Sequence, residues 1–560
     1  MGEENKMVLA MYDVRGKQEF IFRTNKLQEI VGGSWIIRDI FEDYLYEAAK
    51  QGSINEKGIY RYNTGDPFKK EEMRKHFKDG YIGEVIYEGG GNFLLVFKDE
   101  STFEDVTRKF TTEIIKNIGT LHVLGTCVEV SDDNLTNYKK DNENLYNLHR
   151  KKEAMDGYIG PWACLPFSQV DRKTSMPLID YNDEMYLKEE KDKSIREVIR
   201  SKGQLTKESF AKLKKYHEVV NGIKKGNKND DTVLEIERDY FKKNTDILDE
   251  IVEEKGVDSK LAIVYIDGNS MGAKVRKEIE NKEDTKEPAL ANYDYDRCVN
   301  ALRDFSKGIQ ETYIEKGIKA AFKDLVNDPY RIVVYAGDEV NFIVRAGDAF
   351  SCAKNYLDSL KEKNEGEDSA CAGISIFHSH SSYSDAYRIA EEACESGKKK
   401  MKEMDLECAS FIDFHFGQGA TGITLEEIRK KDNADDIIGR PWLMWSKDKN
   451  DVKDVKDVIT YDDAEKIVAL VNAMGRGNVK GLAESAKKSR TDLEMEINRI
   501  YSHQSESDKV KNAKIWETAM AMDKIKFRKL IYDVVLAYDC WFDEGNKEKS
   551  NEWGMTNEQG

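Results

Sequence analysis

Two carboxylates stand side by side at Asp338 and Glu339, between apolar runs at residues 332–335 and 340–344. This pattern predicts two short β-strands joined by a tight turn, with the acidic pair at its tip. Adjacent like charges repel each other, so the pair suits such a turn only if a divalent cation shares both side chains. The spacing therefore predicts a cation site at this hairpin.

A third carboxylate, Asp267, lies at the end of an apolar run over residues 261–266 and directly before Gly268. The run predicts a buried strand that ends in a glycine turn. Asp267 with Asp338 and Glu339 is a candidate carboxylate set for divalent metal ions. The alternative is that the acidic turn is a relic on a non-catalytic scaffold.

A cation that faces these carboxylates is predicted at Lys398. Residues 385–404 have the spacing of a helix, in which Ala390, Ala393 and Gly397 form a small-residue face that can pack closely on a sheet. Lys398 follows this face directly and is the lysine expected to meet a triphosphate. A lysine near a helix C-terminus also suits the helix dipole, whatever the function.

The chain is predicted to contain an internal duplication. Its first part has the order β-α-β-β-α-β, which is typical of a ferredoxin-like fold. The strand over residues 7–13 corresponds to that over 261–267, and the hairpin over 84–97 corresponds to the acidic one. Gly32 and Gly33 are expected to interrupt the first helical segment.

The first hairpin has glycines at its tip instead of an acidic pair. The alignment places Gly90 and Gly91 under Asp338 and Glu339. Glycines allow a close backbone approach, which can seat a base or a phosphate, although a plain glycine hairpin is the simpler interpretation. The residues predicted to bind nucleotide are Gly89, Gly90, Gly91, Asn92, Gly268, Gly337 and Lys398.

Four domains are expected: 1–133, a degenerate first copy; 134–258, a charged helical connector; 259–430, the catalytic second copy; and 431–560, an α-helical domain for docking or packing. Within the connector, residues 181–258 are densely charged and predict solvent-facing helices. Its cluster of Lys224, Lys225 and Lys228 is interpreted as a solvated face, with an RNA-binding patch as the alternative. His378 and His380 have the spacing of metal ligands but no evident third ligand.

Composition and net charge limit the classes of function that the chain can have. The formal net charge is −17, which does not suit a protein that alone wraps nucleic acid but suits an enzyme that binds metal-chelated nucleotides. The 8 cysteines form no C-x-x-C pair, and no apolar run is long enough for a membrane span. Reduced thiols and a cytoplasmic location are expected.

Several motifs in order resemble the large polymerase-like subunit of type III CRISPR effector complexes, the CRISPR polymerase family. The stretch 13–34, the glycine hairpin at 89–93, the Asp-Gly-Asn-Ser-Met-Gly at 267–272 and the Ala-Gly-Asp-Glu at 336–339 are similar to that family's motifs. The last motif is also similar to the GGDEF turn of diguanylate cyclases. Asn269 stands where the family has an Asp.

The resemblance implies two palm domains and ATP-dependent synthesis of a small linear or cyclic oligonucleotide messenger, such as a cyclic oligoadenylate, in antiviral defence. Asp267, Asp338 and Glu339 would hold Mg²⁺ or Mn²⁺, and Lys398 would neutralise the triphosphate. Guide RNA–protein subunits or self-association are the implied partners, with no membrane. The chain is expected to be a shortened variant without the HD nuclease domain or zinc ribbon. A non-catalytic nucleotide- or RNA-binding scaffold and a partner-binding sensor are the competing classes.

Overall fold

The computed structural model divides the chain into two compact units. Met1–Tyr240 and Ser270–Glu311 form the first unit, and Phe241–Asn269 and Thr312–Gly560 form the second. The structure describes residues 6–24, 26–50, 57–63, 65–89, 91–155, 169–172, 174–180, 196, 201, 203–224, 248–252, 259–280, 293–325, 328–363, 368–416, 423–431, 436–447 and 458–541.

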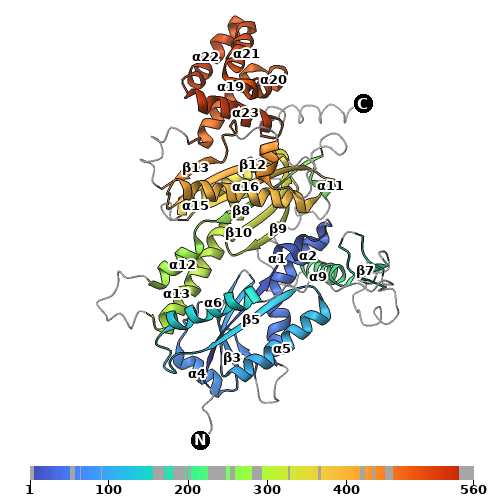
Figure 1. Ribbon diagram of the computed structural model, residues 1–560, viewed down its shortest axis with the longest axis vertical. Coiled ribbons are helices and arrows are strands. Elements are labelled where there is room, and N and C mark those ends of the chain that lie inside the picture. The colour runs from blue at the N-terminus through green and yellow to red at the C-terminus, as the bar shows by residue number, and fades with distance from the viewer. Residues whose placement is uncertain are drawn as a thin grey trace, which may run out of the picture. The chain divides into compact units, whose positions relative to one another are not determined.

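The first unit contains a mixed sheet in the order β2-β3-β4-β1-β5 (Figure 1). Strand β1 lies between β4 and β5 and pairs antiparallel with both, which gives the strand order of a ferredoxin-like fold. Consecutive residues of β1, β3 and β4 are buried, so the sheet is covered on both faces. The strands are β1 (Val8–Arg15), β2 (Ile59–Tyr60), β3 (Gly83–Gly89), β4 (Asn92–Phe97) and β5 (His122–Glu129), and a separate pair is formed by β6 (Leu178–Asp180) and β7 (Gln204–Thr206).

Helices cover this sheet, and one of them follows strand β8 in the chain. The helix α13 buries Tyr295, Cys298 and Val299 in the same core as residues of β1 and β3, and Arg303 donates to the backbone oxygen of Val85 at 2.6 Å. The helices of the first unit are α1 (Lys17–Phe22), α2 (Leu27–Ile40), the π-helix η1 (Phe41–Leu45), α3 (Tyr46–Lys50), α4 (Lys70–Lys78), α5 (Glu100–Asn117), α6 (Tyr138–Met155), α9 (Lys207–Lys224), α12 (Met271–Glu280) and α13 (Tyr295–Ile309).

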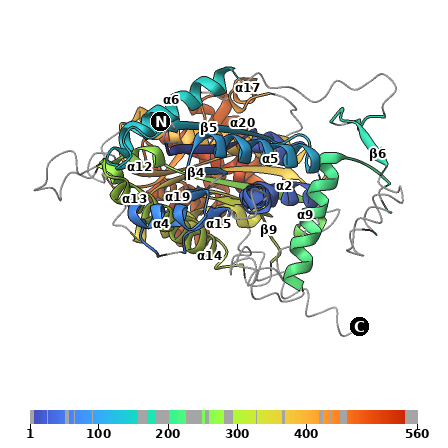
Figure 2. The same cartoon turned by 90° about the horizontal axis from the view of Figure 1, so that it is seen from below.

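The prediction that Gly32 and Gly33 interrupt a helix is wrong, because α2 runs through both. They lie where α9 crosses α2, and the two helices lie side by side (Figure 2). A Cβ on Gly32 would lie 2.0 Å from the backbone oxygen of Lys212. The expectation of solvent-facing helices in this part of the connector is wrong for α9, since Lys212 is fully buried and bonds to Glu208 at 2.6 Å. Lys225 and Lys228 lie outside the described residues.

Four neighbouring strands of the second unit repeat the strand order of the first, with β9, β10, β8 and β11 in the places of β3, β4, β1 and β5. Its sheet has the order β13-β12-β11-β8-β10-β9, with β8 pairing antiparallel to β10 and β11 as β1 pairs to β4 and β5. This match confirms the predicted ferredoxin-like duplication. The strands are β8 (Lys260–Gly268), β9 (Arg331–Ala336), β10 (Glu339–Arg345), β11 (Ala370–His378), β12 (Ala409–Phe416) and β13 (Trp442–Ser446).

The two hairpins correspond with a shift of one residue from the sequence alignment. In the first unit Asp13 is opposite Asn92, and in the second Asp267 is opposite Glu339. Glu339 therefore corresponds to Asn92, and Asp338 corresponds to Gly91. A bulge lies at the same place in both hairpins, after Val85 in β3 and after Ile332 in β9, so it does not cause the shift. The sequence alignment erred because it matched Tyr87 with Tyr335 by residue type.

Helices α15 and α16 pack on the second sheet, and α16 lies across β11 and β12 (Figure 1). The C-terminal helices α19–α23 gather in a helical region, as predicted. Side chains of Thr460, Ser489 and Ser505 cap three of them. The helices of this unit are α11 (Leu248–Ile251), the π-helix η3 (Gln310–Lys316), α14 (Gly317–Ala321), the 3₁₀-helix η4 (Ala346–Asp348), α15 (Ala349–Lys363), α16 (Tyr383–Glu403), α17 (Leu425–Lys431), α19 (Tyr461–Met474), α20 (Arg476–Lys488), α21 (Arg490–His503), α22 (Glu506–Met520) and α23 (Lys524–Trp541). None of the described helices is both long and apolar enough to span a membrane.

Candidate acidic site at the end of β8

The sheet register brings two of the three predicted carboxylates together. Asp267 and Glu339 are directly opposite each other on β8 and β10, so their side chains share one face of the sheet. Asp338 lies in the adjoining turn, where its backbone oxygen accepts from the Gly268 amide at 3.3 Å. Gly337 has φ +63°, a conformation that favours glycine in this tight turn.

Close packing of α16 places Lys398 beside this acidic set. A Cβ on Gly373 of β11 would lie 1.9 Å from the backbone oxygen of Ala390, and a Cβ on Gly397 would lie 3.0 Å from Phe411. These contacts confirm the predicted small-residue face. Lys398 lies one helical turn after Cys394 on α16, and its ammonium forms an ion pair with the Asp267 carboxylate.

Burial and the nearby charge of Asp267 raise the pKa values of Asp338 and Glu339. Burial, with the charge of Asp267 second, raises the pKa of Asp338 to about 6. The same two causes raise the pKa of Glu339 to about 7, although the Tyr387 hydroxyl donates to it at 3.3 Å. Burial alone would lower the pKa of Lys398, but the charge and hydrogen bond of Asp267, with smaller contributions from its other neighbours, together outweigh it and the pKa is raised.

The donor set suits a hard divalent cation, because it offers carboxylate oxygens and one ammonium is too little charge to balance three ionised carboxylates. In the described part of the chain, no three His, Cys, Asp or Glu side chains already surround a common point as ligands. Lys398 lies against Asp267 and supplies positive charge there. His378 and His380 have ring centres 5.3 Å apart and are both exposed.

Asn269, which stands where the similar family has an Asp, faces the interior. Its side chain is 1% exposed and donates to the Ser369 hydroxyl at 3.1 Å and to the Ala409 backbone oxygen at 2.8 Å. These bonds join the end of β8 to the starts of β11 and β12. Asn269 therefore stabilises the strand ends that carry the acidic residues, a role that its place in the motif did not reveal.

The predicted glycine hairpin lies in the first unit and has basic neighbours. Gly91 has φ +75°, and a Cβ there would lie 2.9 Å from the Lys17 ammonium. Asp13, at the end of β1, pairs with Arg15 at 3.0 Å and with Lys17 at 3.6 Å. Gly89 and Asn92 flank this turn as the last and first residues of their strands, and Gly90 lies outside the described residues.

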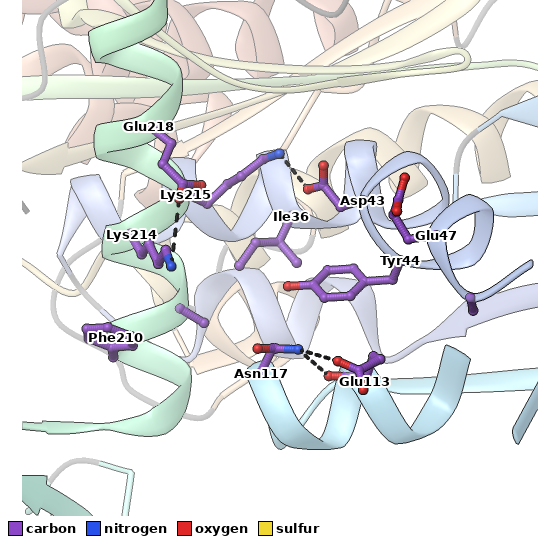
Figure 3. Close-up of a pocket in the computed structure, with 12 residues that line it drawn as sticks. Ile36, Asp43, Tyr44, Glu47, Glu113, Asn117, Phe210, Lys214, Lys215 and Glu218 are labelled. Atoms are coloured by element: carbon purple, nitrogen blue, oxygen red, sulfur yellow. Dashed lines mark hydrogen bonds and ion pairs between the residues drawn. The ribbon is translucent and has the colours of Figure 1, made fainter. Parts of the chain in front are cut away.

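The first unit also has a cavity of about 390 Å³ between α2, η1, α5 and α9 (Figure 3). The Tyr44 ring lies across it, and Lys215 bonds to Asp43 at 2.7 Å along its edge. None of the residues predicted to bind metal or nucleotide lines it. Sequence reasoning missed it because its walls come from three segments that are far apart in the chain.

Residues 260–406, which include Asp267, Asp338, Glu339 and Lys398, match the family described as Cas10/Cmr2, second palm domain. The chain is similar to a Csm1–Csm4 cassette crystallised with cA4 (12% identity, TM-score 0.43, 95% of this chain and 70% of that chain). It is also similar to such a cassette with one ATP (11%, 0.45, 96% and 70%) and to Csm1 of T. onnurineus (10%, 0.42, 95% and 69%). No curated protein matches the chain.

Proposed function

We propose that this Cas10-like chain, which carries a second palm domain of the Cas10/Cmr2 family, is a nucleotidyltransferase that joins ATP-derived nucleotides into a small linear or cyclic oligonucleotide messenger. The observation that supports this most directly is the cross-strand pair of Asp267 and Glu339, with Asp338 in the adjoining turn. Antiviral defence of the type III CRISPR kind is the proposed setting. Guide RNA–protein subunits or further copies of the chain are the proposed partners.

The acidic residues are proposed to bind metal ions, and Lys398 is proposed to bind the triphosphate. Bound Mg²⁺ or Mn²⁺ would supply activation of a ribose hydroxyl and charge neutralisation at the attacked phosphate. Asp267 and Asp338 would hold the ions, and Glu339 would assist. The Lys398 ammonium would leave Asp267 and pair with the triphosphate. In the first unit, the Gly91 turn with Lys17 beside it would seat the phosphates of another nucleotide.

The test is incubation with each nucleoside triphosphate and Mg²⁺ or Mn²⁺, with products identified by mass spectrometry and pyrophosphate measured. We expect oligoadenylate from ATP, and a loss of at least about 100-fold in Asp338→Ala, since the substitution removes a metal ligand. Glu403→Gln is the matched control, because Glu403 is an exposed carboxylate on α16. Wild-type product formation by Asp338→Ala would exclude this site.

A non-catalytic nucleotide- or RNA-binding scaffold is the second candidate. The ion pair between Lys398 and Asp267 favours it, because the pair already satisfies one of the predicted metal ligands. ATP binding that is independent of divalent ions, together with no pyrophosphate release, would support the scaffold. RNA that copurifies with the chain and raises its absorbance at 260 nm relative to 280 nm would identify the bound species.

A further inference from the structure

We infer that Asp413 and Asp533 are positioning residues that hold α16, and with it Lys398, against Asp267. The inference rests on the proposed function of Lys398 as the triphosphate-binding cation. It assigns to the C-terminal helical region a part in nucleotide binding, through a continuous series of buried polar contacts within the second unit.

The contacts begin on α23. The carboxylate of Asp533 is fully buried and pairs with Arg440, whose side chain is 2% exposed. The second carboxylate oxygen of Asp533 accepts from the Gly439 amide at 2.9 Å and from the Trp442 indole at 3.3 Å. Each oxygen of Asp533 thus has a defined partner, which fixes α23 to the segment that enters β13.

The contacts continue from Arg440 to β12. The Nε of Arg440 lies 3.4 Å from Oδ1 of Asp413 and donates to the backbone oxygen of Phe414 at 2.7 Å. Arg429 of α17 binds both oxygens of Asp413, at 2.7 and 3.0 Å. Asp413 is fully buried, and the pairing keeps its pKa below the usual range in spite of burial.

The contacts end on α16. The hydroxyl of Ser396 bonds to Asp413, and Lys398 lies two residues further along the same helix. Two carboxylates and two guanidinium groups are balanced in this network, so removal of one leaves a buried charge without its partner. Loss of Asp533 is therefore expected to shift Arg440 and Asp413, to loosen the hold on Ser396 and to let Lys398 move from its place.

The kinetic test is a double-mutant cycle on the full chain. We expect Asp533→Asn to raise the KM for ATP about 5- to 10-fold with a smaller change in kcat, and to have no further effect in the Lys398→Met background. Ser396→Ala, which cuts the contact at α16 and leaves all four charges in place, is expected to behave in the same way. Effects that multiply with those of Lys398→Met would show a merely structural role and overturn the inference.

Hydrogen–deuterium exchange provides a readout that does not need turnover. Peptides from residues 390–403 are expected to exchange faster in Asp533→Asn and Ser396→Ala than in the wild type. Leu493→Ala, which removes a buried side chain of α21 away from these contacts, is the control for general loosening of the helical region. Unchanged exchange in α16, or equal acceleration by Leu493→Ala, would overturn the inference. A wild-type chain without turnover would contradict the proposed function, and the exchange result would still decide whether α16 is held in this way.

Discussion

Asp338→Asn is expected to make the metal-free protein more stable at pH 8 and, under the proposed function, to lower turnover. Burial and the neighbouring Asp267 charge raise the pKa of Asp338 from 3.8 to about 6, so the folded chain binds the Asp338 proton more tightly than the unfolded chain. The resulting stabilisation is complete below about pH 4 and is lost as the pH rises through about 6. Above that range an ionised Asp338 opposes folding.

The size of the effect follows from the pKa. At about 1.4 kcal/mol per pKa unit, the rise corresponds to about 3 kcal/mol. Part of the rise comes from the Asp267 charge and part from burial, so we expect a gain of about 1–3 kcal/mol at pH 8. At pH 4 the substituted and native side chains are both neutral, and the difference is expected to vanish.

The assay is urea unfolding in EDTA at pH 4 and pH 8, with hydrogen exchange of peptides from β8 and β10 to follow the second unit. Glu403→Gln is the control and should change neither curve. Mg²⁺ should reverse the order at pH 8, because ions that bind only the native carboxylates stabilise the wild type by mass action. A variant that is equal to or less stable than the wild type at pH 8 without metal would refute the reasoning.

Three further substitutions have defined outcomes. Lys398→Met should raise the KM for ATP at least about 10-fold in steady-state assays and should also lower the unfolding free energy, because it leaves the mostly buried Asp267 carboxylate without its cation; an unchanged KM would contradict this. Gly373→Ala should lower the melting temperature by several degrees, because the added Cβ would lie 1.9 Å from a backbone oxygen of α16. An unchanged melting curve would contradict this and would mean that α16 can move away from the sheet without cost. Tyr387→Phe removes the bond that lowers the pKa of Glu339, so the acidic limb of the pH–rate profile should move to higher pH; an unmoved limb would exclude Glu339 from the titration.

Local patterns in the sequence predicted the acidic hairpin, the strand before Asp267 and the small-residue face of α16. Each depends on residues that are close in the chain, where periodicity and turn chemistry are visible. The alignment of the two hairpins missed by one residue because it matched tyrosines and glycines by residue type, whereas the strand pairing sets the true correspondence. Gly32 was misinterpreted because the sequence does not distinguish a glycine that makes room for a neighbouring helix from a glycine that ends a helix.

Long-range electrostatic partners were beyond the reach of the sequence. Asp413 and Asp533 are 120 positions apart, and nothing near either one indicates that Arg440 lies between them. The same is true of Asn269, whose partners come from two other strands. A charged residue in an apolar segment predicts that it has a partner of opposite charge, but only the fold identifies that partner.

The packing of α13 has a consequence for recombinant fragments. This helix follows β8 in the chain, yet Tyr295, Cys298 and Val299 are buried among side chains of the N-terminal half. A fragment that begins at residue 259 would expose those apolar side chains to solvent. Such a product is expected to aggregate on expression, whereas coexpression with residues 1–258 should recover a soluble pair.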